Sequence, residues 1–263
     1  MNISQILDLD ACHYENHSKS QYERVKEFIS SVKIHASDSI LDVGCGFGNI
    51  IAEISQVAPE GRCIGIDPSP NMIHLALQKF PKSKFPNLEF YNIKAEEMNF
   101  SPKTFDVIIC TNALLWIRRP HAALELMCSY LKPGGLILIL TYLNNTPYAL
   151  IFQRVLEKYF PMYAHLSASN FMLSEKEHKN ILIANDLKLE EFLSEEVYFQ
   201  YKNSEELKNY VKGWLNCFVP LPEDLQALFL NKVVKESRLA NVSTNENEII
   251  IPHKLLTIRG RKY

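Results

Sequence analysis

The sequence predicts an α/β fold: a doubly wound, seven-stranded, mostly parallel sheet with helices on both faces and a small helical cap. Short apolar runs alternate with amphipathic helical segments through the first half of the chain, and this alternation is typical of parallel sheets covered on both faces. A glycine-rich turn follows the first apolar run, at the edge where such sheets place their ligands. The second half departs from the alternation and is rich in aromatic residues, which predicts the cap.

The composition narrows the class of protein. The chain has 263 residues, of which 47% are hydrophobic, and a formal net charge of -2. This is ample for a packed domain, and the near-neutral charge disfavours nucleic acid and anionic membranes as partners. The 6 cysteines include no C-x-x-C pair, and no apolar run is long enough to cross a membrane. We therefore expect reduced thiols, no bound metal, no membrane segment and a cytoplasmic location.

Residue spacing places the elements of the first half in order. Apolar strands lead into Gly44 and end at Asp67, Cys110 and Leu140. Between them, apolar residues three and four apart predict helices. The helical stripes are Val25, Phe28, Ile29 and Val32; Ile50, Ile54 and Val57; Ile73, Ala76, Leu77 and Phe80; and Leu124, Met127, Cys128 and Leu131.

The second half predicts the cap and the last two strands. Residues 144–171 form an aromatic-rich insertion, Ser174 opens a helix as part of a capping box with Glu177, and residues 187–201 predict an extended segment. A final strand is expected near 254–259, with Pro252 leaving its start open. One helical stripe contains Leu207, Tyr210, Val211, Trp214, Leu215 and Phe218, and a further helix begins at Pro222. Aromatic residues that suit either a pocket or a cap core are Tyr142, Tyr148, Phe152, Phe160 and Phe171.

The glycine-rich turn carries the most information about function. Residues 40–49 read Ile-Leu-Asp-Val-Gly-Cys-Gly-Phe-Gly-Asn, so three glycines are each two residues apart. A dinucleotide fingerprint has its third glycine three residues after the second, and the pattern here is different. Asp42 stands two residues before Gly44, Asp67 ends the second strand, and Leu-Lys-Pro-Gly-Gly at 131–135 precedes a further apolar strand.

These motifs, in this order, resemble the Rossmann-like core of class I S-adenosylmethionine (SAM)-dependent methyltransferases. The resemblance covers residues 20–141 and implies SAM as cofactor and S-adenosylhomocysteine as product. Another Rossmann-like nucleotide binder is the alternative. On this interpretation residues 1–263 form one domain, with an N-terminal lid and helix at 1–33, a SAM-binding core at 34–142, a cap-bearing half at 143–248 and the final strand at 249–263.

The resemblance also implies roles for individual residues in cofactor binding. The glycine turn would face the amino-acid and ribose portions of SAM, Asp67 the ribose hydroxyls, and Pro68 and Met72 the adenine. Lys94 stands where the family has an acidic adenine contact, so Ala95 and Glu96 are the expected substitutes. The full cofactor-binding set is Tyr14, Ser18, Asp42, Gly44, Cys45, Gly46, Gly48, Asp67, Pro68, Met72, Ala95, Glu96, Cys110 and Thr111.

Two further patterns bear on the methyl acceptor. The Tyr14-x-x-x-Ser18-x-x-Gln21 spacing, with Trp116 after the fourth strand, resembles plant carboxyl methyltransferases of the salicylate and benzoate type. Trp116 with a later Gly-Trp and a proline-rich segment at 219–222 resembles the trans-aconitate, juvenile hormone acid and malonyl-carrier-protein methyltransferases. The resemblance implies that Gln21 and Trp116 orient a carboxylate with neutral donors, which leave the nucleophile charged.

Other interpretations remain open from sequence alone. Gln21 also suits an exposed helix start, and Trp116 and Trp214 also suit a packed core. The protein could be an N- or C-methyltransferase of another small metabolite, or a SAM-binding protein without catalysis, and a macromolecular acceptor is disfavoured by the charge. The acceptor, a free acid or one linked to a carrier protein, is open, and we expect a monomer or weak dimer.

Overall fold

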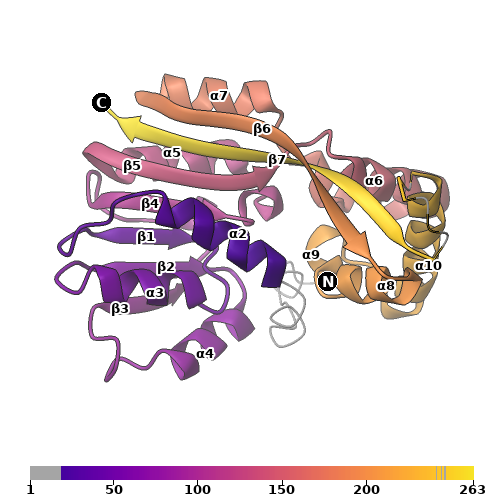
Figure 1. Cartoon of the computed structure of the whole chain (residues 1–263), viewed down its shortest axis with the longest axis horizontal. Helices are drawn as coiled ribbons and strands as arrows, with labels where there is room; N and C mark the ends of the chain where they lie inside the picture. The colour runs from indigo at the N-terminus through magenta and orange to yellow at the C-terminus, as the bar shows by residue number, and fades with distance from the viewer. Residues whose placement is uncertain (1–18, 241, 244, 246) are drawn as a thin grey trace.

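The computed structural model describes residues 19–240, 242–243, 245 and 247–263, and in them the predicted fold is confirmed. A seven-stranded sheet has the order β3-β2-β1-β4-β5-β7-β6 (Figure 1). The first five strands run parallel, and β7 is antiparallel to both of its neighbours. The strands are β1 Ile40–Val43, β2 Cys63–Asp67, β3 Leu88–Asn92, β4 Phe105–Thr111, β5 Leu131–Tyr142, β6 Leu187–Tyr201 and β7 Ile249–Lys262.

Helices cover both faces of the sheet, because alternate strand residues feed two separate hydrophobic clusters. Ile40 packs with residues of α2, α3 and α4, whereas Leu41 and Val43 pack with residues of α5 and α7. The α-helices are α2 Lys19–Ser30, α3 Asn49–Val57, α4 Pro70–Lys79, α5 Pro120–Tyr130, α6 Pro147–Tyr159, α7 Glu175–Ala184, α8 Ser204–Lys212, α9 Leu215–Phe218 and α10 Glu223–Leu239. Single-turn elements are η2 Ala95–Glu97, η3 Leu114–Trp116, η4 Pro161–Leu166 and η5 Ala168–Asn170.

The cap stands beyond the carboxyl ends of the central strands. Figure 1 shows β6 and β7 continuing past the sheet as a two-stranded ribbon, with α8, α9 and α10 joined to its far end. These helices lie between the last two strands, as predicted. Helix α6 packs against α10 and β7, so the insertion after β5 also contributes to the cap.

Most elements match the predicted ranges, and the departures have physical reasons. The extended segment 187–201 is β6, and the capping box at Ser174 opens α7. Val57 and Leu77 were predicted on buried stripes, which is wrong, because their exposed fractions are 56% and 53%. They lie at the edges of short helices, where the stripe already turns toward solvent.

Two predicted elements of the cap region differ in their bounds. The stripe 207–218 is not one helix, because α8 ends at Lys212 and α9 begins after Trp214, whose φ is -131°. The final strand runs from Ile249 to Lys262, so it extends beyond the stretch expected at 254–259 and nearly fills the predicted segment 249–263. Pro252 lies where β7 pairs with β6 alone, since pairing with β5 begins at Leu255. A residue without an N–H is tolerated at such an unpaired edge.

No helix among the described residues is both long and apolar enough to span a membrane. Within the same residues, no group of three or more His, Cys, Asp or Glu side chains is arranged to hold a metal ion. Cys45, Cys63, Cys110 and Cys128 are free thiols.

Candidate cofactor and acceptor site

The glycine turn after β1 packs against protein at Gly44 and is open at Gly46. Gly44, Gly46 and Gly48 all have positive φ, at 77°, 55° and 84°. A Cβ on Gly44 would meet the Cβ of Ala113 at 2.2 Å, whereas a Cβ on Gly46 would meet no atom within 4 Å. Gly44 is therefore required by protein packing, and Gly46 opens onto a cavity where backbone can approach a ligand.

Asp67, at the end of β2, is held in place by the same turn. Its Oδ2 accepts a hydrogen bond from the Gly46 amide at 3.0 Å, and its Oδ1 accepts one from the Ser69 amide at 2.9 Å. Burial raises the pKa of Asp67 to about 6, although both hydrogen bonds act to lower it. The carboxyl group is thus fixed at the cavity wall with lone pairs left for further donors.

A second buried acid stands beside it. Asp42 is 2% exposed, and burial followed by the charge of Asp67 raises its pKa to about 7. Two neighbouring carboxyl groups at the ends of β1 and β2 favour a ligand with positive charge, because such a ligand stabilises their ionised forms.

The cofactor cavity has two parts that share Gly44, Asp67, Ala113, Trp116 and Cys217. The first, of about 140 Å³, contains Asp42, the glycine turn and residues of α2, α9 and the segment after β4. It is lined by Tyr22, Val25, Asp42, Gly44, Cys45, Gly46, Phe47, Asn49, Ile50, Asp67, Met72, Thr111, Asn112, Ala113, Trp116, Trp214 and Cys217. The second, of about 80 Å³, is lined by Val43, Gly44, Asp67, Pro68, Ile93, Lys94, Ala95, Glu96, Ala113, Trp116, Ile117 and Cys217.

Most residues of the implied cofactor set come together in this cavity. Asp42, Gly44, Cys45, Gly46, Asp67, Met72 and Thr111 line the first part, and Pro68, Ala95 and Glu96 line the second. Gly48 and Cys110 do not line either part, because Gly48 packs on the Phe90 ring and Cys110 is fully buried in the sheet. Tyr14 and Ser18 lie outside the described residues, and Gln21 is described only as part of helix α2.

The second part of the cavity suits a planar ring without the family's usual acid. Lys94 forms an ion pair with Glu97 at 3.1 Å, so its charge is taken up by a neighbour on η2. Ile93, Ala95 and Ile117 supply apolar walls, and Glu96 supplies a carboxylate. The structure thus offers a surface for adenine in which Lys94 contributes its stem.

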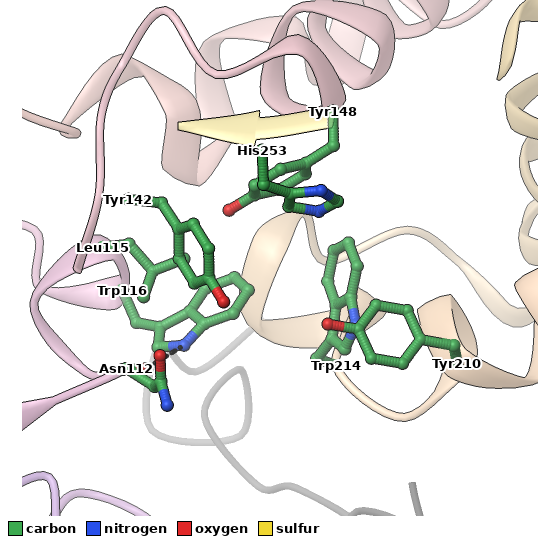
Figure 2. A pocket seen from close by; sticks show the side chains of 8 residues that line it. All are labelled: Asn112, Leu115, Trp116, Tyr142, Tyr148, Tyr210, Trp214 and His253. Carbon is green, nitrogen blue, oxygen red and sulfur yellow. Dashed lines mark hydrogen bonds between the residues drawn. The ribbon is translucent and has the colours of Figure 1, made fainter. Parts of the chain in front are cut away.

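A third cavity, of about 30 Å³, adjoins the cofactor cavity and is predominantly aromatic. Figure 2 shows its eight lining side chains, which come from β4–η3, β5, α6, the cap and β7. They are Asn112, Leu115, Trp116, Tyr142, Tyr148, Tyr210, Trp214 and His253. We call it the acceptor cavity, because Asn112, Trp116 and Trp214 line it and the first part of the cofactor cavity alike. Its volume holds one or two waters, so a larger ligand requires the cap to shift.

The two tryptophans in the wall differ in their hydrogen bonding. The indole N–H of Trp116 donates to the backbone carbonyl of Asn112 at 3.1 Å. The indole N–H of Trp214 is buried and has no hydrogen-bond partner among the described residues, and the same holds for Oδ1 of Asn112. The ring of Trp214 stacks on Phe152, with centroids 5.2 Å apart. Trp214 therefore carries the available donor in this wall, which sequence reasoning had assigned to Trp116.

Sequence reasoning missed His253 as a lining residue, as it did Asn112, Leu115 and Tyr210. Nδ1 of His253 lies 3.0 Å from the carbonyl oxygen of Ile251, which can only accept, so Nδ1 carries the hydrogen and Nε2 a lone pair. Burial lowers the pKa of His253 to about 3, against a smaller opposing effect of that hydrogen bond. The imidazole is neutral at physiological pH. The one available signal was its place in the final strand, and strand alternation alone does not predict a cavity-lining role.

This fold and site define a SAM-dependent methyltransferase of class I. A model of the methyltransferase domain family matches residues 34–212, and the chain belongs to that family. Its cofactor is SAM. Gly46 leaves the room that a ligand needs, Asp67 stands at the end of β2, and the adjoining apolar pocket suits adenine.

Curated relatives share the core but differ in acceptor. The chain is 30% identical over 142 residues to the malonyl-[acyl-carrier protein] O-methyltransferase of Halalkalibacterium halodurans, covering 51% of this chain and 52% of that protein. It is 32% identical over 131 residues to phosphoethanolamine N-methyltransferase 1 of Triticum aestivum, covering 49% and 25%. The chain thus spans about half the length of the first relative and a quarter of the second.

Solved structures share the fold over nearly the whole chain. The YcgJ protein of Bacillus subtilis has a TM-score of 0.69 at 19% identity, covering 92% of this chain and 98% of that one. Phosphoethanolamine N-methyltransferase 2 of Haemonchus contortus, in complex with phosphomonomethylethanolamine and S-adenosylhomocysteine, has a TM-score of 0.61 at 16% identity, covering 96% and 56%.

Proposed function

We propose that this enzyme transfers the methyl group of SAM to a carboxylate oxygen of a small acid by in-line displacement. The observation that carries the proposal is the unpartnered, buried indole N–H of Trp214 in a cavity whose eight lining side chains are uncharged. The similarity to the malonyl-[acyl-carrier protein] O-methyltransferase supports an acid acceptor, free or linked to a carrier protein.

The chemistry of the cavity favours a nucleophile that is already ionised. SAM supplies an activated methyl on a positive sulfonium, so positioning and exclusion of water account for most of the remaining barrier. A carboxylate needs no general base at neutral pH. His253, with its pKa lowered to about 3, is too weak a base to remove a proton from an alcohol or an ammonium group.

Neutral donors suit this acceptor better than a cation does. An arginine would bind the carboxylate but would neutralise the attacking oxygen, whereas an indole N–H orients one oxygen and leaves its charge. We assign this role to Trp214, since the Trp116 N–H is held by the Asn112 carbonyl. Gln21 remains a second donor by resemblance, and Trp116 would form the wall between methyl and acceptor.

The experiment is transfer of methyl-labelled SAM to a panel of free and carrier-linked acids, followed by mild alkali. Label released as methanol would establish a methyl ester, and label that survives alkali would exclude the carboxylate. Trp214→Phe keeps the stacked ring and removes the donor. It should lower kcat/KM about 10- to 100-fold, since a hydrogen bond to a charged group contributes about 1.5–3 kcal/mol. SAM affinity should be unchanged.

Trp116→Phe is the matched comparison, because it also replaces an indole by a phenyl ring in the same wall. We expect its effect on kcat/KM to be smaller than that of Trp214→Phe. The reverse order would return the donor role to Trp116 and would mean that its bond to Asn112 breaks when the acceptor binds.

A second candidate is methylation of an amine nitrogen. Asn112 Oδ1 is a buried acceptor without a partner in the wall between the two cavities, and an amine N–H would satisfy it. The similarity to phosphoethanolamine N-methyltransferases supports this alternative. Its product would keep the label in alkali. On either route we propose a cytoplasmic enzyme, since the buried Cys63, Cys110 and Cys128 are free thiols.

A further inference from the structure

The acceptor cavity contains more hydrogen-bonding capacity than a simple acid can use. Besides the Trp214 N–H, it presents the acceptor Asn112 Oδ1, which is likewise buried without a partner among the described residues, and the imidazole of His253, which lines the cavity. Nε2 has no hydrogen bond to any described residue, and the other ring nitrogen is committed to Ile251. A buried polar atom without a partner costs about 1–3 kcal/mol, so such atoms mark places where a ligand or water supplies the missing bond.

The His253 ring is fixed in one orientation. It stacks on Tyr148 with centroids 4.6 Å apart and an interplanar angle of 25°, and it lies 4.1 Å from the Phe199 ring. Rotating the imidazole by half a turn would break the bond from Nδ1 to Ile251. Figure 2 shows the ring over the space between Tyr148 and Trp214. Nε2 is therefore a preorganised acceptor on the cavity wall.

We infer that the acceptor carries a hydrogen-bond-donating group, a hydroxyl or an amide N–H, besides its carboxylate, and that His253 Nε2 selects for it. The inference rests on the proposed function for the carboxylate, which the Trp214 N–H orients. The donating group would reach into the aromatic end of the cavity, and Asn112 Oδ1 would take a second N–H or O–H. Hydroxy acids and acylamino acids fit this pattern, and unsubstituted aliphatic acids leave the acceptors unpaired.

The test compares matched pairs of acids that differ by one hydroxyl. The wild-type enzyme should prefer the hydroxylated member by about tenfold or more in kcat/KM. The acid without the hydroxyl leaves His253 Nε2 without a hydrogen-bond partner. His253→Phe keeps a planar ring and removes the acceptor, so the preference should fall to near one, through KM for the hydroxylated acid. His253→Gln, which places an oxygen near the position of Nε2, should restore part of it.

His178 provides a matched control. It is likewise a buried histidine whose Nδ1 bonds a backbone carbonyl, that of Ser174 at 2.8 Å, and whose Nε2 has no partner. It lies on α7, which packs against α5 and β6 away from the cavity. His178→Phe should leave the hydroxyl preference intact, so a general effect of replacing a buried histidine is separated from recognition.

The same pairs are also measured by binding to the enzyme loaded with S-adenosylhomocysteine, together with amines that do or do not carry a hydroxyl. If label proves stable to alkali but hydroxylated ligands still bind preferentially through His253, the proposed function fails and this inference stands. If esters form with equal efficiency from both members, or His253→Phe keeps the preference, the inference is overturned. Failure of every member to bind would also overturn it.

Discussion

Replacing Asp42 by Asn should stabilise the protein while weakening its cofactor site. Asp42 is 2% exposed and stands beside Asp67. Burial and that neighbour raise its pKa from an ordinary 3.8 to about 7. Asparagine has nearly the same shape and no charge, so the substitution removes the cost of ionising a buried carboxyl group and leaves packing unchanged.

The size of the effect follows from the difference between the two pKa values. The unfolded chain releases the Asp42 proton near pH 3.8 and the folded protein near pH 7. Between these pH values the carboxyl group is ionised in the unfolded chain but protonated in the folded protein. The group therefore lowers the free energy of unfolding as pH rises from about 4 to about 7, and its effect is constant above pH 7. At 1.36 kcal/mol per pH unit, the loss reaches about 4 kcal/mol at pH 8.

Urea unfolding of wild type and Asp42→Asn at about pH 3 and about pH 8, values chosen to bracket that window, measures this difference. The variant should match wild type closely at the lower pH and exceed it by about 4 kcal/mol at the higher one. Asp186→Asn is the control, because that side chain is 76% exposed and its removal should give no pH-dependent gain. A gain of equal size at both pH values would refute the argument, since it would show that the charge of Asp42 is not the cause.

Four other substitutions separate cofactor binding from stability. Gly46→Ala and Gly134→Ala both place a Cβ at positive φ with no atom within 4 Å. Each should lower the free energy of unfolding in urea by about 1 kcal/mol. In calorimetric titration, SAM affinity should fall at least about tenfold for Gly46→Ala and stay unchanged for Gly134→Ala. Asp67→Asn removes a charged carboxylate that two backbone amides hold in place, so SAM should bind about 10- to 100-fold more weakly. Wild-type affinity for SAM should decline as pH falls through about 6, where Asp67 is protonated, and the variant should lack this decline. Ser174→Ala removes a helix cap remote from both cavities and should cost about 1 kcal/mol with kcat/KM unchanged; loss of activity would contradict that placement.

The parallel core could be predicted because its signals are local. A strand that ends in Asp67, or a turn marked by three alternating glycines, is recognised from residues within ten positions of each other in the sequence. The cap was harder. Apolar spacing continues through Gly213 and Trp214 although the helix breaks there, because both short helices bury the same face and periodicity alone does not register the break.

The site divides in the same way. The cofactor residues follow the carboxyl ends of β1, β2 and β4, and their motif predicts them together. The acceptor cavity joins Asn112, Tyr142, Tyr148, Trp214 and His253 from five separate elements, and no local pattern links them. The indole N–H of Trp116 donates to a backbone carbonyl, whereas that of Trp214 has no acceptor among the described residues. This difference depends on side-chain orientation, which residue type does not predict.

The distribution of charge between the two cavities connects binding to the proposed chemistry. Asp42 and Asp67 place acids beside the cofactor, whereas the lining of the acceptor cavity is uncharged. A carboxylate that enters this cavity finds no cationic side chain among the lining residues, and burying an unpaired anion is costly. Its counter-charge must then be the sulfonium across the shared wall of Trp116 and Trp214. On the proposed function, the acid would bind well only after SAM. Transfer would remove both charges at once, so the neutral ester and S-adenosylhomocysteine would lose the attraction that held the reactants.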